Sequence, residues 1–263
     1  MPEAKSTDEV RPSGTRVVVL DRVDSTNAQA LRSAAAGERG PLWIVAKEQT
    51  ASRGRRGRAW TSPVGNLHAT LMLIDPAPPA VAPQLSFVAA LALHDAAAHA
   101  APTLASRLAL KWPNDLLCGG RKIAGILIEG EGDPVSVAVG IGVNCLHHPD
   151  AAEFPATDFG AEGADVSAAA LFDALVAAMN ARLRVWNRGA GFAAIRAEWL
   201  ARAAGIGEPI RVRLSGHETA GYFETVDESG RLMLRTGPGD GPGNLAAIAA
   251  GDVFPFEPTR RTG

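Results

Sequence analysis

The spacing of hydrophobic and polar residues changes several times along the chain, and each change predicts a different element. Runs rich in β-branched residues and bounded by Gly, Pro, Asn or Asp are typical of strands, whereas alanine-rich amphipathic stretches are typical of helices. Helices are expected at residues 26–36, 84–99, 167–187 and 190–203, with Asp24 or Ser25 capping the first. Strands are predicted at residues 16–20, 43–47, 66–74, 108–112, 122–129 and 135–143.

Short glycine-containing connections then indicate how these strands pair. Gly119-Gly120 and Gly132-Asp133-Pro134 are too short for a parallel crossover, so both predict antiparallel hairpins between the runs on either side. After Gly205 the pattern shifts to short strand-like runs at residues 209–214, 217–225 and 231–235. These runs predict a small β-barrel, which Ala250-Gly251-Asp252-Val253 closes.

We therefore expect an α+β protein with a mixed, mostly antiparallel sheet and helices packed on one side of it. Residues 16–205 would form this larger domain, and residues 206–263 the small β-barrel. The remaining residues, 1–15, combine charges with Pro2, Pro12 and Gly14 and lack an apolar core, so they are expected to be a flexible tail.

Composition narrows the classes of protein that the chain can belong to. Hydrophobic residues make up 46% and charged residues 21% of the 263 residues, as in ordinary globular proteins. The net charge of −2 argues against general affinity for nucleic acid or anionic membrane, so any anion site must be local. No segment has the pattern of a signal peptide or a membrane span, and the two distant cysteines fit a reducing compartment. We expect a cytoplasmic protein.

The clearest chemical signal is Arg53-Gly54-Arg55-Arg56-Gly57-Arg58, here called the arginine loop. Its guanidiniums repel one another unless anions lie between them, and Gly54 and Gly57 permit positive φ and close approach to a ligand. Backbone N–H groups and arginine forks suit phosphate or carboxylate oxygens. A solvated basic loop or a nucleic-acid patch explains the loop, taken alone, equally well.

Two further motifs place lysines at strand ends. In the first motif, Lys111-Trp112-Pro113-Asn114-Asp115, a strand ends at a proline, which directs the chain into a turn. Taken alone, this motif is better explained as a turn than as a nucleotide-binding site. Arg121-Lys122-Ile123-Ala124-Gly125 opens a strand, and its small residues leave space above the sheet into which Lys122 could reach. Solvation is the ordinary state of a lysine in that position.

Polar residues near the predicted first helix offer uncharged contacts. Ser25-Thr26-Asn27 reads first as a helix cap, although its hydroxyls can also face a ligand. Gln49 follows a strand and suits an amide or urea group. Gly140-Ile141-Gly142-Val143-Asn144 lacks the full dinucleotide fingerprint, and His147-His148 has no partner at metal-ligand spacing, so neither a Rossmann site nor a metal site is predicted.

The order and chemistry of these motifs resemble the biotin protein ligase family. The matching stretches are Ser25-Thr26-Asn27, Glu48-Gln49-Thr50, the arginine loop with Trp60, Lys111-Trp112-Pro113-Asn114-Asp115-Leu116, Arg121-Lys122-Ile123-Ala124-Gly125-Ile126-Leu127 and Gly140-Ile141-Gly142-Val143-Asn144. Residues 250–253 resemble, less closely, the family's C-terminal SH3-like domain. Ser52 departs from the family, which usually has glycine there, and argues against a strongly positive φ at that position.

The resemblance implies a class II synthetase-like catalytic domain that uses ATP, biotin and Mg²⁺. The implied reaction forms biotinyl-5'-AMP and then transfers biotin to a lysine of a biotin carboxyl carrier domain from an acyl-CoA or pyruvate carboxylase. The implied primary catalytic residues are Lys122, Arg53 and Arg55. Biotin would contact Ser25, Thr26, Asn27, Gln49, Arg53, Gly54, Arg55, Lys122, Gly125, Leu127 and Gly142. The nucleotide would contact Arg55, Arg56, Arg58, Trp60, Lys111, Asn114 and Asn144, and no residue is assigned to the metal.

Other functions stay open at this stage. A lipoate or octanoate ligase-transferase resembles the same domain, and a non-catalytic binder of biotinyl-AMP or nucleic acid could use the same loop. Because the first matching motif begins at Ser25, the helix-turn-helix domain of the family's bifunctional members has no room, so we expect no DNA binding. We also expect no membrane partner, and either a monomer or a homodimer.

Overall fold

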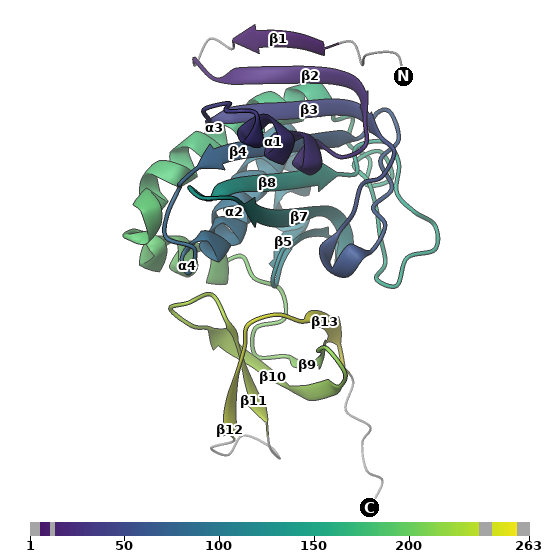
Figure 1. The fold of residues 1–263 in the computed structure, drawn as a ribbon. Coiled ribbons are helices and arrows are strands. Elements are labelled where there is room, and N and C mark those ends of the chain that lie inside the picture. The colour runs from purple at the N-terminus through teal and green to yellow at the C-terminus, as the bar shows by residue number, and fades with distance from the viewer. Residues whose placement is uncertain (1–5, 11–13, 237–243, 257–263) are drawn as a thin grey trace, which may run out of the picture.

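The computed structural model describes residues 6–10, 14–236 and 244–256, which form two β-sheets with helices packed against the larger one (Figure 1). The larger sheet has eight strands in the order β1-β2-β3-β4-β8-β7-β6-β5. Only β2 and β3 are parallel among its pairs of neighbours, so the sheet is mixed and mostly antiparallel, as predicted. Its strands are β1 Ser6–Val10, β2 Arg16–Val23, β3 Leu42–Gln49, β4 Leu67–Ile74, β5 Leu108–Lys111, β6 Asp115–Cys118, β7 Arg121–Glu131 and β8 Ser136–Val143.

Helices cover both faces of this sheet, which corrects the expectation of one covered face. Residues alternate across the strands, so Ile44 packs under α1 whereas neighbouring Trp43 faces the opposite side and meets Phe172 edge-on, with ring centroids 5.3 Å apart. Both faces of β3 are therefore apolar. The helices are α1 Thr26–Ala35 on one face, and α2 Leu85–Ala100, α3 Ala168–Trp186 and α4 Phe192–Leu200 on the other.

Serine side chains cap two of the α-helices, and one of these caps, Ser25, was predicted. Ser25 caps α1 by accepting the Ala28 N–H, and Ser167 caps α3 by accepting the Ala170 N–H.

None of the helices in the described part of the chain is long and apolar enough to cross a membrane. Cys118 and Cys145 are buried thiols, and burial raises the pKa of Cys145 to about 11.

Two strands of the larger sheet were not predicted. Ser6–Val10 form β1, antiparallel to β2, so this part of the expected flexible tail is ordered, while residues 1–5 and 11–13 lie outside the described residues. Asp115–Cys118 form β6, which pairs with both β5 and β7. The Gly119-Gly120 hairpin therefore joins β6 to β7 and not β5 to β7, because the chain already turns once at Pro113.

The smaller sheet is antiparallel and has five strands in the order β12-β11-β10-β9-β13. Among the described residues, β13 lies at one edge of this sheet beside β9, and β12 lies at the other edge. Residues 252–255 therefore form an edge strand where closure of a barrel was predicted. β12 was not predicted, and residues 237–243 and 257–263 lie outside the description. The strands are β9 Pro209–Arg213, β10 Glu218–Val226, β11 Leu232–Thr236, β12 Asn244–Ile248 and β13 Asp252–Pro255.

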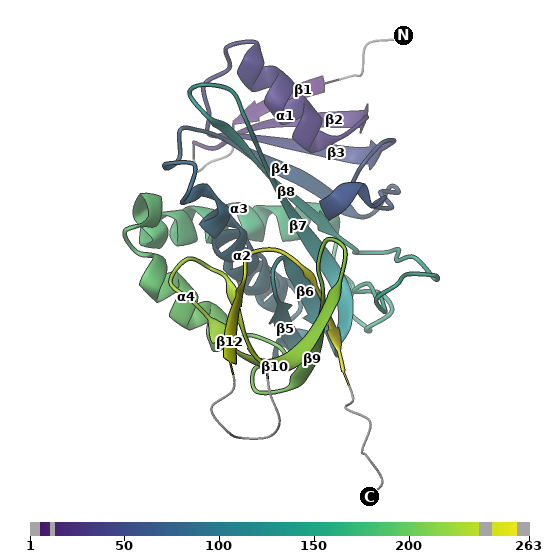
Figure 2. The ribbon, with the colours of Figure 1, turned by 60° about the horizontal axis from the view of Figure 1, so that its bottom comes forward.

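The two sheets are joined by a buried contact around Phe87 of α2. Its ring packs edge-on against Phe192 and Trp199, with centroids 5.5 Å and 5.1 Å away. Gly230 of the smaller sheet approaches so closely that a Cβ there would lie 2.8 Å from the Phe87 ring, and its carbonyl accepts the Trp112 indole N–H at 3.1 Å. This contact holds the smaller sheet beside α2 and the β5–β6 hairpin (Figure 2).

We predict that Phe87→Ala lowers the free energy of unfolding by about 3–5 kcal/mol, because a large ring leaves a cavity that three neighbours line. Urea denaturation measures this loss. Leu245→Ala is the matched control, since Leu245 is 51% exposed and its truncation should change the unfolding free energy by less than about 0.5 kcal/mol. Equal effects of the two substitutions would contradict the assignment of Phe87 as the central contact.

Candidate active site

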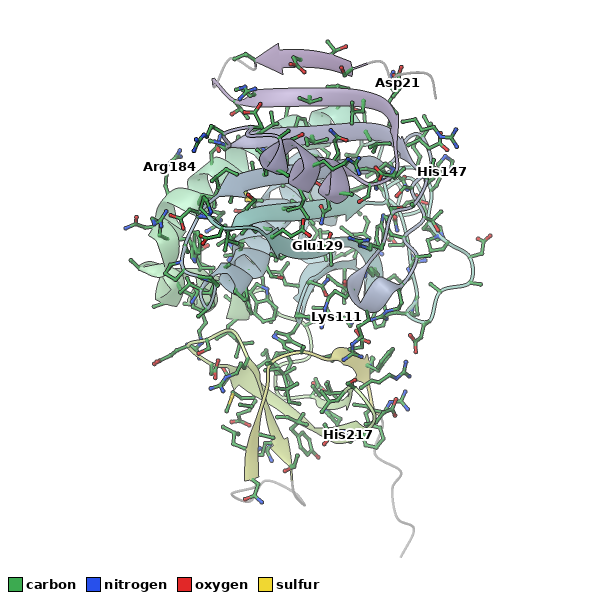
Figure 3. The ribbon with its side chains drawn as sticks, in the orientation of Figure 1. Asp21, Lys111, Glu129, His147, Arg184 and His217 are labelled. Atoms are coloured by element: carbon green, nitrogen blue, oxygen red, sulfur yellow. The ribbon has the colours of Figure 1, made fainter. Side chains whose placement is uncertain are left out.

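A cavity of about 510 Å³ opens on the α1 side of the large sheet and reaches the smaller sheet. Its wall comes from the start of α1, the end of β3, the arginine loop, the β5–β6 hairpin, β7, β8, residues 149–156 and β13. Figure 3 shows Lys111, one of the lining residues, close to the smaller sheet. The lining therefore joins segments from nearly the whole chain.

Glycines of β7 and β8 let two other side chains pack closely on the sheet at the cavity. Gly140 and Gly142 lie on the cavity face of β8, and a Cβ at Gly140 would lie 2.2 Å from Asn27 Oδ1. At Gly142 a Cβ would lie 2.7 Å from the indole nitrogen of Trp60, whose ring also borders Gly125 on β7. That indole N–H is buried and has no hydrogen-bond partner among the described residues. The missing side chains thus allow Asn27 and the Trp60 ring to lie directly against β8, and they leave the buried indole N–H without a partner in the described part of the chain.

One wall consists of uncharged hydrogen-bonding groups. Gln49 Oε1 accepts from the backbone N–H of Thr26 at 2.8 Å and from its hydroxyl at 3.0 Å, and Gln49 Nε2 donates to Ser62. The hydroxyl oxygen of Thr70, which is buried on β4, lies within hydrogen-bond distance of both Thr26 Oγ1 and Asn27 Oδ1. These bonds fix the start of α1 relative to β3 and β4, and they leave a polar surface suited to a neutral amide or urea.

The arginine loop has a conformation that the sequence did not predict in detail. Positive φ occurs at Arg56, at 56°, and at Gly57, at 71°, whereas Gly54 has a φ of −94°. Ser52 is not among the positive-φ residues, in agreement with the expectation for a serine. Its hydroxyl lies 2.7 Å from the Trp60 carbonyl and 2.8 Å from Ser62 Oγ, so it joins the two ends of the loop.

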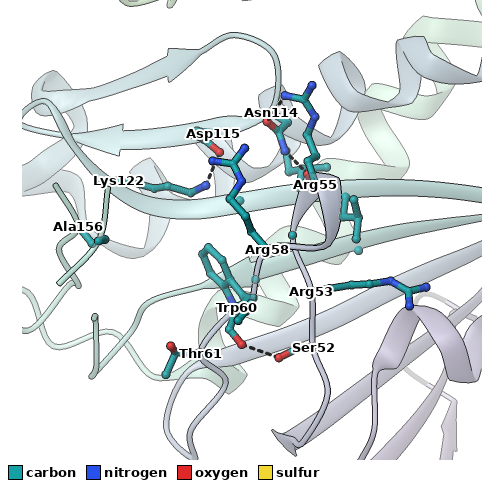
Figure 4. A pocket seen from close by; sticks show the side chains of 18 of the residues that line it. Ser52, Arg53, Arg55, Arg58, Trp60, Thr61, Asn114, Asp115, Lys122 and Ala156 are labelled. Carbon is teal, nitrogen blue, oxygen red and sulfur yellow. Dashed lines mark hydrogen bonds and ion pairs between the residues drawn. The ribbon is translucent and has the colours of Figure 1, made fainter. Parts of the chain in front are cut away.

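The four guanidiniums of the loop all face carboxylates. Arg53 pairs with Glu129 of β7 at 2.9 Å and points away from the other cations in Figure 4. Arg55, Arg56 and Arg58 contact Asp252 of β13 at 3.9, 3.2 and 2.5 Å, respectively. Burial lowers the pKa of Arg55, and Asp252 partly offsets this shift.

A buried carboxylate also links the two lysines of the site. Asp115 Oδ1 lies 2.6 Å from Lys122 Nζ and its Oδ2 3.2 Å from Lys111 Nζ (Figure 4). Burial favours the neutral acid, but Lys122 and Lys111 together outweigh it and lower the pKa of Asp115. Burial also lowers the pKa of Lys111, although Asp115 opposes that shift. The pair of ammonium groups is thereby held beside the cavity.

A second loop, residues 144–167 between β8 and α3, closes the far side of the cavity. Phe154 in this loop lies against Lys111, with the ammonium nitrogen 4.3 Å from the ring centroid. Asn66 Oδ1, near the end of the segment that carries the arginine loop, accepts the N–H groups of residues 145, 146 and 147 at 3.0–3.1 Å. The side-chain amide of Asn144 donates to the Thr157 carbonyl.

The structure brings nearly all predicted site residues together at this cavity. The exception is Arg56, which is not a lining residue, although it contacts Asp252 of the lining and the Arg213 carbonyl. The predicted residues that line the cavity are Ser25, Thr26, Asn27, Gln49, Arg53, Gly54, Arg55, Arg58, Trp60, Lys111, Asn114, Lys122, Gly125, Leu127, Gly142 and Asn144.

Sequence reasoning missed the carboxylates. Asp115 belongs to the motif that begins at Lys111, but no role was predicted for it. Its place between two lysines depends on the turn between β5 and β6, which the sequence pattern did not resolve. Asp252 also belonged to a quoted motif, yet its distance from the arginine loop in sequence gave no sign of contact. Phe154 carried no signal in its turn-rich segment.

The donor set of the cavity does not form a metal site of its own. Within residues 6–10, 14–236 and 244–256, no three His, Cys, Asp or Glu side chains gather so as to hold an ion. Asp115 and Asp252 are both engaged by lysine or arginine. A magnesium ion, which prefers oxygen ligands and retains water, would therefore have to bring most of its ligands from a bound polyphosphate and solvent.

The sequence of the chain is similar to those of several known proteins. Residues 19–145 match the model of the Biotin/lipoate A/B protein ligase family, and residues 205–254 match that of the Biotin protein ligase C terminal domain. The Biotin--[acetyl-CoA-carboxylase] ligase of Paracoccus denitrificans is 48% identical over 245 residues, covering 90% of this chain and 99% of that protein. The enzyme of the same name from Mycobacterium tuberculosis is 34% identical, covering 89% of this chain and 87% of that protein.

Solved structures show the same fold. The biotin protein ligase from Aquifex aeolicus, solved in complex with biotin and ATP, superposes with a TM-score of 0.75 at 24% identity. The alignment covers 90% of this chain and 97% of that one, so it includes both sheets.

We predict that Asp115→Asn lowers the free energy of unfolding by about 3–5 kcal/mol, because it leaves two partly buried ammonium groups without their shared carboxylate. The pKa of Asp115 is lowered by folding, so its stabilisation is complete above the unfolded value and is lost as the pH falls through the folded one. Urea denaturation at neutral pH and at about pH 3 should thus give a large and a smaller difference from wild type.

Asp21→Asn serves as the control for this measurement. Asp21 pairs with Lys47 at 2.7 Å on the surface, where both side chains are more than half exposed, so its loss should cost less than about 1 kcal/mol. If Asp115→Asn is no more destabilising than Asp21→Asn at neutral pH, Asp115 is not the counter-ion described here.

Proposed function

This chain belongs to the biotin protein ligase family, and we propose that it activates biotin with ATP and transfers it to a lysine of a biotin carboxyl carrier domain. The observation that carries the proposal is the joining, in one cavity, of an uncharged hydrogen-bonding wall and a cluster of fixed cations. Biotin has a neutral ureido ring at one end and a carboxylate at the other. A cavity with these two ends matches that division.

The first step must bring two anions together. An oxygen of the biotin carboxylate would attack the α-phosphorus of ATP, a new P–O bond would form, and the bond to the β-phosphate would break to release pyrophosphate. Carboxylate and polyphosphate repel each other, so preorganised cations that neutralise both are the natural source of rate enhancement. Arg55, Arg58 and Lys122 supply such charge in the cavity, and Arg53 stands at its edge.

Lys122 is the residue that we assign to the reacting atoms. It is the second residue of β7, beside Gly125, and its ammonium group is held by Asp115 at 2.6 Å while 24% of its side chain stays exposed. A lysine that is anchored yet accessible can bind the carboxylate and the α-phosphate at their junction. Asp115 would keep it in place without itself contacting substrate.

The ureido ring would bind at the other end of the cavity. Ser25, Thr26, Asn27 and Gln49 present hydroxyl and amide groups there, and a buried urea needs such partners for its donors and acceptors. We propose that Trp60, which lies over the glycines of β7 and β8, borders the bound ring system. Water excluded by this wall could not hydrolyse the acyl adenylate.

The nucleotide would occupy the part of the cavity between the arginine loop and the second loop. Lys111, Asn114 and Asn144 line this part, and apolar atoms of Phe154 offer a surface for a base. Because the carboxylates of the cavity are engaged by lysine and arginine, we propose that magnesium enters as MgATP, with its ligands mainly from phosphate and water.

The second step needs a partner protein. The amine of an acceptor lysine would attack the acyl carbon, the C–O bond to the phosphate would break, and AMP would leave with the proton lost to solvent. The name of the Paracoccus relative gives acetyl-CoA carboxylase as its target. We propose that the acceptor of this chain is likewise a biotin carboxyl carrier domain of an acyl-CoA carboxylase.

Mass spectrometry of a carrier domain tests the whole proposal. The domain is incubated with the protein, biotin and MgATP, and its mass should rise by one biotinyl group. A carrier variant with arginine in place of the acceptor lysine should stay unmodified, and lipoate supplied in place of biotin should give no product. An unmodified carrier in the presence of biotin, or equal modification by lipoate, would overturn the assignment.

We predict that Lys122→Ala lowers the rate of biotinyl-AMP formation by at least about a hundredfold, because a fixed charge at the reacting atoms is removed. Pyrophosphate release in the presence of biotin and ATP measures this rate. Lys47→Ala is the matched control, since Lys47 is exposed on β3 away from the cavity lining. A Lys122→Ala rate close to that of Lys47→Ala would remove Lys122 from the reaction.

A further inference from the structure

Asp252 connects the smaller sheet to the arginine loop. It begins β13, and its carboxylate contacts Arg58 at 2.5 Å, Arg56 at 3.2 Å and Arg55 at 3.9 Å. Only 13% of its side chain is exposed, whereas its arginine partners are 21–48% exposed. One carboxylate from the far end of the chain thus faces three cations of the candidate phosphate site.

Backbone groups of the same sheet strengthen this contact. The Gly251 carbonyl accepts from Arg55 Nη1 at 3.1 Å, and the Arg213 carbonyl accepts from Arg56 Nη1 at 3.4 Å. A Cβ at Gly251 would lie 2.6 Å from the Val212 side chain, so only glycine allows β13 to start this close to β9. The position of Asp252 is therefore set by the sheet and not by the loop.

Without such an anchor, the arginine loop would lose conformational entropy each time it binds an anion. Like charges favour extended loop conformations, and ordering several long side chains at binding costs conformational entropy. A carboxylate that is fixed by a sheet removes part of this cost in advance, which increases affinity for the ligand that the guanidiniums bind. The strand also directs Phe254, two residues later, to the same cavity.

We propose that Asp252 is a positioning residue for the nucleotide phosphates, through which the C-terminal sheet holds Arg55 and Arg58 at the cavity. The role rests on the proposed function. Asp252 itself contacts no substrate. It acts through the guanidiniums, and the smaller sheet is thereby a working part of the nucleotide site.

Steady-state kinetics of Asp252→Asn test this role. We expect the KM for ATP to rise about tenfold, equivalent to about 1.4 kcal/mol, while the KM for biotin changes less than about twofold and kcat less than about threefold. Asp252→Glu keeps the charge and should return most of the affinity for ATP. Glu228→Gln, which neutralises an exposed acid in the β10–β11 turn of the same sheet, is the matched control.

Trypsin provides a readout that does not depend on catalysis. Cleavage after the arginines of the loop should be severalfold faster in Asp252→Asn than in wild type or Glu228→Gln, because the loop opens more often. Inorganic pyrophosphate should protect wild type at lower concentration than it protects Asp252→Asn. Circular dichroism and the Tm establish that each variant is folded.

Two results would overturn the proposal. One is an Asp252→Asn protein that matches Glu228→Gln both in the KM for ATP and in trypsin cleavage. The other is a lower KM for ATP in Asp252→Asn, which would mean that the carboxylate competes with phosphate. Should wild type form no biotinyl-AMP, the proposed ligase function fails, whereas the trypsin and pyrophosphate comparison still decides the role of Asp252.

Discussion

Cations that repel one another must be held around one cavity, and the architecture of the protein follows from this requirement. Two unit charges about 4 Å apart near a protein surface interact by about 4 kcal/mol, so each positive group needs a fixed opposite charge. Glu129 on β7, Asp115 on β6 and Asp252 on β13 supply these charges from three separate strands. The strands of the two sheets thus hold three carboxylates in fixed positions, and each carboxylate pairs with basic side chains of the site.

Much of the fold and of the site could be predicted because both depend on local patterns. The apolar runs gave six of the strands of the larger sheet approximately, and the alanine-rich stretches gave all four α-helices to within a few residues at each end. Gln49 ends β3 and Lys122 is the second residue of β7, so residues singled out by chemistry also lay at strand ends. Strand ends meet at one edge of a sheet, which is why scattered motifs converge on one cavity.

The remaining features depend on contacts that no local pattern encodes. The β1 segment Ser6–Val10 is exposed and polar, so only its pairing with β2 makes it a strand. The choice of face for α1 follows from apolar residues on both sides of β3, which periodicity alone does not separate from a single buried face. Positive φ occurs at Arg56 as well as at Gly57, but not at Gly54, and the Arg56 side chain bonds to Asp252 of β13 and to the Arg213 carbonyl of β9, contacts that the loop sequence does not indicate.

Asn66 has a consequence for how this protein can change over evolutionary time. One side-chain oxygen receives three successive amides of the second loop, while its amide group donates to the His147 carbonyl, so a single residue ties together two surface loops. An insertion beside Asn66 or beside residues 145–147 would break all these bonds at once. The lengths of the two loops next to this residue are therefore constrained together, and grafting one of them from a distant homologue would require grafting the other.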